Sequence, residues 1–152
     1  MRTIKEKACS LITTAKGEEK NAVKEQKDPT PYLLPDGTTI ILGEEKYKAP
    51  EILFSPEKAS QEYPGVHEML YKSIMKTDID LRRDLFSQIY LSGGTTMFAG
   101  FAQRLMNELK ALKQELKIKI YSPSERQLSC WLGGSILASL NSFSKMLITK
   151  KV

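Results

Sequence analysis

The chain has 152 residues, of which 41% are hydrophobic and 27% charged, a balance that is typical of one globular domain and excludes a disordered chain. Its 23 basic and 18 acidic residues give a net charge of +5, but they are interspersed, which favours a solvated surface over direct contact with nucleic acid. No apolar run approaches the roughly 20 residues of a membrane span, no signal peptide is recognisable, and Cys9 and Cys130 are too far apart to suggest a metal site. We therefore expect an intracellular protein that binds neither nucleic acid nor a membrane.

The N-terminal third predicts a helix, a polar loop and a β-hairpin. Residues 1–8 have the pattern of a helix end, with apolar residues on one face and charges elsewhere. The polar stretch 15–31 predicts a surface loop or a frayed helix. A Pro-Asp-Gly turn signal at residues 35–37 separates the apolar residues 32–34 from the strand-like residues 38–42, so we expect a hairpin there.

The middle of the chain predicts helices. The segment from Pro50 to Phe54 is consistent with the start of a short helix, because proline is tolerated in a first helical turn. Apolar residues then recur with helical spacing over residues 66–75 and 79–86. His67, at the start of the first of these helices, has no metal-ligating partner in the sequence and is predicted to be structural.

The last third alternates strands and helices. Short strands are predicted at residues 88–91 and 117–121, and helices at residues 101–112 and 132–140. Strand, helix, strand and helix in this order predict an α/β fold with parallel strand pairing.

The turn after the first of these strands, residues 92–96 with the sequence Ser-Gly-Gly-Thr-Thr, is a candidate binding site. Two glycines between a strand and a helix let a ligand approach the backbone closely, and ligands of open α/β sheets bind beyond the carboxyl ends of the strands. A plain connector has the same composition, so the residues alone leave both interpretations open.

Six ordered segments resemble the actin family, and together they extend over nearly the whole chain. The last of them, Trp-Leu-Gly-Gly-Ser-Ile-Leu-Ala-Ser-Leu, is close to a family signature. The segments are residues 4–7, 34–37, 50–54, 91–97, 117–120 and 131–140. The resemblance implies a partial actin-like fold of the ribonuclease H-like, Hsp70-type ATPase class. In it, residues 1–60 would end the small outer subdomain, and residues 61–152 would supply inner-subdomain elements and the C-terminal helix.

The resemblance also implies part of a nucleotide site. Actins bind ATP or ADP with a divalent cation, and a Gly-Gly-Thr-Thr-Met turn and a Lys-Glu pair form the adenosine side. The corresponding nucleotide-binding residues here are Lys5, Glu6, Gly93, Gly94, Thr95, Met97 and Phe98. Without the resemblance, Met97 and Phe98 would be ordinary core candidates. A family lysine beside the base corresponds to Gln127, so one cationic contact is in doubt.

The family's two phosphate-binding hairpins, and the carboxylates that organise its metal, belong to sequence that precedes the segment resembled here. No similar hairpin occurs in this chain. Phosphoryl transfer depends on charge and metal placed around the γ-phosphate. We therefore expect no catalytic residue and no metal ligand in this chain, weak or no nucleotide binding by the chain alone, and no ATP hydrolysis.

A hydrophobic groove for partners is implied as well. In the family such a groove accepts an amphipathic helix of actin-binding proteins or a loop of a neighbouring actin-like subunit. The residues that would border it here are Leu132, Ile136, Leu137, Leu140 and Met146. Their helical spacing equally predicts core positions.

One departure from the family concerns assembly. Within residues 57–64 actins carry a bulky apolar tip that supports contact between filament strands, whereas residues 58–61 here read Lys-Ala-Ser-Gln. Three interpretations stay open. The chain is part of a cytoplasmic, cytoskeletal actin-like protein, or of a non-polymerising actin-related subunit of a dynactin-like or nuclear chromatin-remodelling complex, or it is a nonfunctional truncated product.

Overall fold

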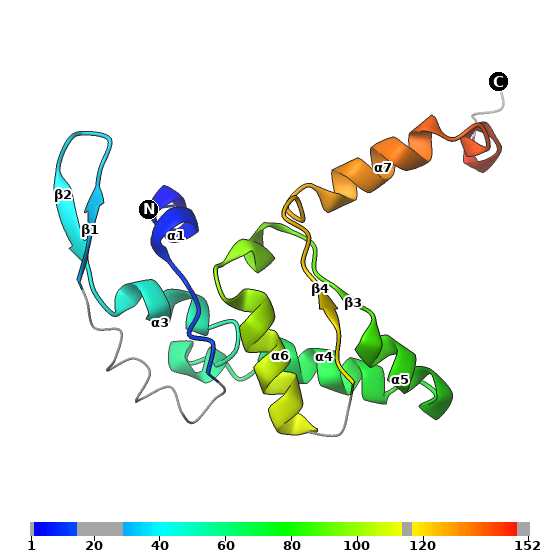
Figure 1. Ribbon diagram of the computed structural model, residues 1–152, viewed down its shortest axis with the longest axis horizontal. Coiled ribbons are helices and arrows are strands. Elements are labelled where there is room, and N and C mark those ends of the chain that lie inside the picture. Colours follow the sequence, from blue (N-terminus) through cyan, green and yellow to red (C-terminus); the bar gives the residue numbers. More distant parts are fainter. Residues whose placement is uncertain (1, 15–28, 114–116, 149–152) are drawn as a thin grey trace.

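Helix α1 (Arg2–Ala8) forms at the start of the chain, as predicted, and a β-hairpin follows in strands β1 (Thr30–Leu33) and β2 (Thr39–Leu42). The computed structural model describes residues 2–14, 29–113 and 117–148 (Figure 1), so most of the loop predicted at residues 15–31 lies outside the described residues. The two strands pair antiparallel across the Pro-Asp-Gly turn. The predicted hairpin is confirmed.

The hairpin turn should respond to acid through Asp36. The Thr38 N–H donates to Asp36 Oδ1 at 2.9 Å, and this hydrogen bond lowers the pKa of the Asp36 carboxyl. A carboxyl whose pKa is lower in the folded state stabilises the fold above its unfolded pKa of about 3.9, and this contribution is lost as the pH falls through the folded pKa. NMR titration of the Asp36 carboxyl should therefore give a midpoint below about 3.9. A midpoint at or above that value would contradict the role of the hydrogen bond.

Helix α3 (Glu45–Glu51) begins before the predicted position, and Pro50 lies in its last turn instead of its first. Proline has no N–H, so the carbonyl of Lys46, four residues earlier, loses its helical partner. The Ser10 N–H donates to that carbonyl at 3.1 Å instead. The prediction of a helix that begins at Pro50 is therefore wrong, and the missing proline N–H leaves the Lys46 carbonyl as an acceptor for Ser10 in the segment that follows α1.

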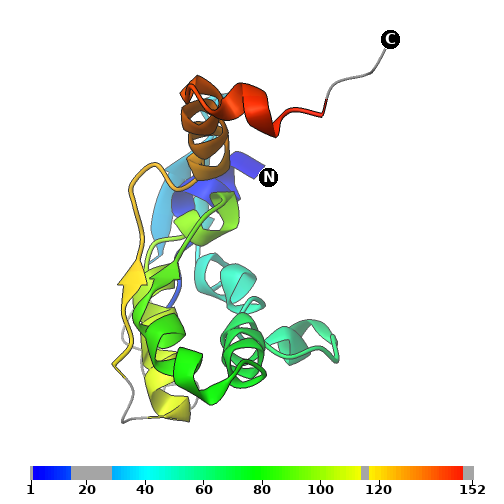
Figure 2. The same cartoon turned by 90° about the vertical axis from the view of Figure 1, so that its right-hand side faces the viewer.

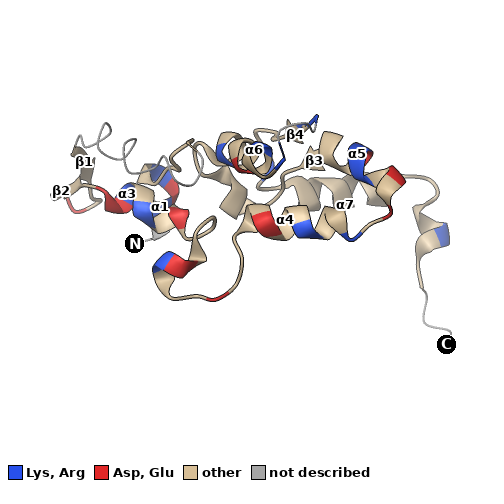
Figure 3. Ribbon diagram, turned by 90° about the horizontal axis from the view of Figure 1, so that it is seen from below, with Lys and Arg blue, Asp and Glu red and all other residues tan. Residues whose placement is uncertain are grey.

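Helices α4 (Val66–Met75) and α5 (Ile79–Ser87) lie where the sequence predicts them and pack against each other. A short 3-10 turn, η1 (Pro56–Ala59), precedes them. Figure 3 shows basic and acidic residues interspersed on α3, α4 and α5, in keeping with the mixed charge pattern of the sequence.

Strand β3 (Ile89–Tyr90), turn η2 (Gly94–Met97), helix α6 (Phe101–Leu112) and strand β4 (Ile120–Tyr121) follow in that order. The strands β3 and β4 pair parallel, with Ile89 opposite Ile120. The α/β order and the parallel pairing are confirmed, although each strand is shorter than its predicted segment. The described residues form two two-stranded sheets, so the ribonuclease H-like architecture stays a prediction.

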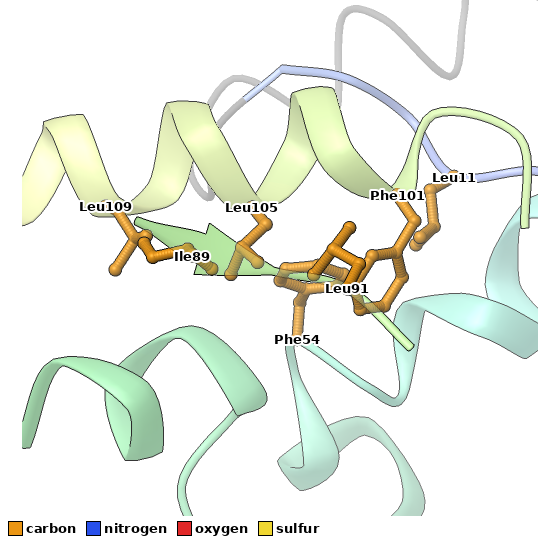
Figure 4. Packing of buried hydrophobic residues seen from close by; sticks show 7 residues of the cluster. All are labelled: Leu11, Phe54, Ile89, Leu91, Phe101, Leu105 and Leu109. Atoms are coloured by element: carbon orange, nitrogen blue, oxygen red, sulfur yellow. The ribbon is translucent and has the colours of Figure 1, made fainter. Parts of the chain in front are cut away.

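The hydrophobic core lies between α6 and β3, where side chains of α6 point toward Phe54 and the strand (Figure 4). It draws on both sides of residue 60, so the subdomain boundary predicted there stays a prediction. The buried core side chains are Leu11, Phe54, Ile89, Leu91, Phe101, Leu105 and Leu109.

A buried ionic cluster fixes α6 against the end of α3. Arg104 is fully buried, and its two Nη atoms donate to the Glu51 carboxylate at 2.7 and 3.0 Å. Its Nε donates to Glu108 Oε1 at 2.8 Å, and Nη1 also donates to the Ile12 carbonyl at 2.9 Å. Burial by itself lowers the pKa of Arg104, but the two carboxylates more than offset this and raise it above its ordinary value. The guanidinium is therefore charged at every pH at which the chain is folded.

His67 connects α4 to the same cluster. Its ring is buried and stacks on Phe54 with 5.7 Å between centroids, and its Nε2 lies 3.9 Å from Glu108 Oε2. This placement between an aromatic ring and a buried carboxylate agrees with the predicted structural role.

Helix α7 (Ser129–Ser139) and turn η3 (Phe143–Met146) project away from the core (Figures 1 and 2). No residue of α7 is buried, so the interpretation of its apolar stripe as core is wrong. The physical reason is that, among the described elements, only the short turn η3 makes substantial contact with this helix. In the part of the chain that the structure describes, no helix is long and apolar enough to cross a membrane.

Candidate functional site

A cavity of about 700 Å³ lies where α1, the end of α3, the turn η2 and the loop before α7 meet. Six of the seven residues predicted at the nucleotide site line it, although they come from two distant parts of the sequence. The lining consists of Lys5, Glu6, Ala49, Pro50, Ile52, Leu53, Gly94, Thr95, Met97, Phe98 and Gln127.

Backbone contacts after α1 bring Lys5 and Glu6 beside η2. The Leu11 N–H donates to the Ala99 carbonyl at 2.8 Å, and Ser10 and Ala99 form a parallel bridge. Gly100 makes this approach possible, because its φ is +84° and a Cβ there would lie 2.7 Å from the Leu11 carbonyl oxygen. A glycine that no motif singled out thus sets the spacing between two walls of the cavity.

The turn η2 is held in shape by Gly93. Its φ of +91° and ψ of +155° belong to a region that is essentially restricted to glycine. Its carbonyl accepts hydrogen bonds from Thr96, from the N–H at 3.1 Å and from Oγ1 at 2.8 Å. Gly93 does not line the cavity, so the structure gives it a conformational role, and the residues of the turn that line the cavity are Gly94, Thr95 and Met97.

Sequence reasoning missed the wall that α3 supplies. Pro50, Ile52 and Leu53 line the cavity opposite the turn, and Glu51, between them, is anchored to Arg104. The available signal was that residues 50–54 form one of the six ordered segments. Nothing in the local pattern indicated that Pro50 and Ile52 would line a cavity while Glu51, between them, forms a buried ion pair.

The lining combines apolar surfaces with a few polar groups. Ile52, Leu53, Met97 and Phe98 offer apolar contact, and the polar side chains are Lys5, Glu6, Thr95 and Gln127. Such a lining suits a flat aromatic ring whose edge carries donors and acceptors. Met97 is exposed and is not a core residue, whereas Phe98 is half-buried and packs against the hydrophobic core while it also lines the cavity.

Metal and phosphate groups fit the described residues less well. The lining holds one cationic side chain, Lys5. Among residues 2–14, 29–113 and 117–148, no group of three or more His, Cys, Asp and Glu side chains could hold a metal ion. The described lining therefore offers groups that can contact a base and a sugar, together with one positive charge.

A second cavity of about 550 Å³ adjoins the first. Lys5 and Ala49 line both cavities. The remaining lining of the second is mainly apolar and comes from α1, β2 and α3: Ile4, Cys9, Ile40, Leu42, Glu45 and Lys46. Burial raises the pKa of the Cys9 thiol, so this cysteine is protonated at neutral pH.

The predicted partner residues lie on α7, at its C-cap residue Leu140 and on η3. Each is exposed, by 43% at Leu137 and by as much as 57% at Met146. Because α7 stands apart from the core in both views, the groove itself stays a prediction (Figures 1 and 2). The apolar residues concerned are Leu132, Ile136, Leu137, Leu140 and Met146.

Comparison with known proteins shows the family of the chain. The family model described as Actin matches residues 1–152. The chain belongs to the actin family. A protein described as "Actin-like protein" from Neurospora crassa is 46% identical to it over 153 residues. That match includes 98% of this actin-family chain and 40% of the Neurospora protein, so the chain spans well under half the length of this relative.

Proposed function

We propose that this actin-family chain supplies the adenosine side of an ATP or ADP site. The observation that supports the proposal is the single cavity of about 700 Å³ that gathers Lys5 and Glu6 of α1 with Gly94, Thr95, Met97 and Phe98 at η2. These two segments are far apart in sequence, and the Leu11–Ala99 hydrogen bond and the Ser10–Ala99 bridge bring them together.

The chemistry of the lining supports a purine base in this cavity. Met97 and Phe98 face it with apolar groups, while Glu6 and Gln127 offer groups that accept or donate hydrogen bonds. A divalent cation, when bound in the complete protein, would neutralise the phosphate charge. We place that cation and the phosphates on parts of the protein other than the residues described here, and we expect the chain alone to bind weakly and not to hydrolyse ATP.

In the complete protein the site would link nucleotide state to the assembly of actin-like subunits in the cytoplasmic cytoskeleton. The exposed apolar side chains of α7 and η3 would then be available to actin-like subunits or actin-binding proteins.

Substitution of Gly94 tests the proposed site directly. A Cβ at Gly94 would meet only Gln127 Cγ, at 3.9 Å, so a larger side chain there enters the cavity without a backbone clash. We expect Gly94→Leu to weaken binding of a fluorescent ADP analogue labelled on the ribose by at least about tenfold. The leucine side chain would take the place of the base in the cavity, so the base would lose apolar contact with the lining. Fluorescence titration measures the dissociation constant.

The matched control is Gly133→Leu on α7, where an added Cβ meets no atom within 4 Å. This variant should bind as the unaltered chain does, and both variants should keep the unaltered far-UV circular dichroism. Equal binding by the Gly94 variant, or no binding by the unaltered chain at millimolar analogue, would overturn the proposal.

A non-polymerising interaction subunit is the second candidate, and Lys58 favours it. The Lys58 Nζ lies 3.8 Å from Glu51 Oε1, so this residue of the polar loop is directed toward the ionic cluster. The loop therefore presents little apolar surface to a neighbouring filament strand. Co-sedimentation with actin filaments separates the two candidates, because only a polymerising subunit should pellet in proportion to filament mass.

A further inference from the structure

Arg126, in the loop before α7, forms hydrogen bonds with the turn η2. Its side chain reaches from the loop before α7 to Thr96, with Nη2 donating to the Thr96 carbonyl at 2.9 Å and Nε donating to Thr96 Oγ1 at 3.1 Å. Its Nη1 donates to the Pro123 carbonyl at 2.9 Å. The guanidinium thus fastens the turn to the loop that follows β4.

The backbone of Arg126 completes this connection. The Gly93 N–H donates to the Arg126 carbonyl at 2.8 Å. The turn is therefore bound to the same residue at its N-cap, Gly93, and at its third residue, Thr96. A one-turn 3-10 helix has poor internal hydrogen bonding, so external bonds of this kind decide whether it keeps one conformation.

Arg126 itself is not part of the cavity lining, whereas its neighbour Gln127 is. Fixing Arg126 consequently fixes two things at once: the turn that carries Gly94, Thr95 and Met97, and the side chain of Gln127 that faces Gly94. This makes Arg126 a positioning residue, because it acts on the cavity only through groups that line it.

We infer that Arg126 presets the η2 turn for the nucleotide base, so that its loss weakens binding while the fold persists. The inference rests on the function proposed above. A turn that is already ordered binds without the entropic cost of being ordered by the ligand. Loss of the charged hydrogen bonds from Arg126 should weaken binding of the ribose-labelled ADP analogue by about 10- to 100-fold.

The test compares Arg126→Ala with Arg83→Ala, an exposed arginine on α5 that serves as the matched control. The first should bind the ADP analogue about 10- to 100-fold more weakly and the second as the unaltered chain does. Adding about 10 mM guanidinium, well below denaturing concentrations, should restore part of the affinity of Arg126→Ala and leave the control unchanged. A purely structural role would not respond to this rescue.

A ligand-free readout distinguishes failure of the inference from failure of the proposed function. The methyl resonance of Met97 should shift toward its unfolded position in Arg126→Ala. The milder Thr96→Val removes the Oγ1 hydrogen bonds to Arg126 Nε and to the Gly93 carbonyl but keeps the bond from Arg126 Nη2 to the Thr96 carbonyl, so it should shift the resonance less. If the unaltered chain binds and Arg126→Ala binds equally well, the inference is wrong and the proposed function stands. If the unaltered chain does not bind, the proposed function fails, and an unchanged Met97 methyl resonance in both variants would then refute the inference as well.

Discussion

Replacing Arg104 by alanine should lower the free energy of unfolding by about 3–5 kcal/mol. The side chain is fully buried and holds the carboxylates of Glu51 and Glu108, which are themselves only 3% and 4% exposed. Without the guanidinium, two negative charges would stay in the interior with their main partner removed. Since small domains are stable by about 5–15 kcal/mol, this single change should bring the chain close to unfolding. Urea denaturation followed by circular dichroism measures the effect.

Two further variants test the cause of the loss. Lys48→Ala removes an exposed ion pair of α3, whose atoms Lys48 Nζ and Glu44 Oε2 lie 2.9 Å apart, and should leave the denaturation midpoint nearly unchanged. Adding Glu51→Gln and Glu108→Gln to Arg104→Ala removes the stranded charges and should recover part of the lost stability. If the triple variant is no more stable than Arg104→Ala, loss of packing and not buried charge explains the effect.

Replacing Phe54 by alanine should cost about 3–5 kcal/mol as well, through a different mechanism. The ring is 1% exposed and joins the segment after α3 to α4 and α6. Its centroid lies 5.5 Å from that of Phe101, 5.7 Å from that of His67 and 5.2 Å from Arg104 Cζ. Its removal leaves a cavity at the point where the hydrophobic core meets the ionic cluster. Thermal or urea denaturation should show a lower midpoint with an unchanged slope.

Leu33→Ala on β1 provides the contrast, because Leu33 is also a large apolar residue but is 67% exposed. Its loss should change the free energy of unfolding by no more than about 0.5 kcal/mol. Similar losses in the two variants would mean that the core does not centre on Phe54. Because the ring also contacts Arg104, the double variant Phe54→Ala and Arg104→Ala should be more stable than the sum of the two single losses implies.

Local sequence patterns predicted most of the elements. The hairpin followed from one Pro-Asp-Gly turn, and α4, α5 and α6 followed from helical spacing, because these features depend on neighbours within a few residues. The error at α3 has a specific cause. Pro50 is acceptable in a last turn only because the Lys46 carbonyl finds Ser10, a contact far away in sequence that no local pattern reveals.

At the candidate site, too, the sequence identified residues but did not reveal the distant contacts that bring them together. The residues of the turn and of α1 were identified through the family resemblance, but their meeting depends on the Leu11–Ala99 hydrogen bond and on the space that Gly100 leaves. Arg126 was missed because its role lies in hydrogen bonds to backbone carbonyls, which leave no spacing pattern. Glu51 and Arg104 were unremarked because charged residues are ordinarily exposed.

Apolar periodicity misled in one place. The stripe on α7 has the spacing of a core helix, yet no residue of α7 is buried. Periodicity reports that one face of a helix favours an apolar neighbour, and it does not say whether that neighbour belongs to the same chain.

The parallel pairing of β3 and β4 also bears on how the chain folds. The Ile89 N–H bonds the Lys119 carbonyl and the Leu91 N–H bonds the Tyr121 carbonyl, so each bond closes a loop that contains η2 and α6. The strands β1 and β2 need only a short turn to meet. Hairpins of that kind form in about 1–10 μs, whereas pairing across a long crossover must wait until the entropy of the loop is offset by packing. The hairpin should therefore be among the first elements to form, and the strand that leads into the candidate site among the last.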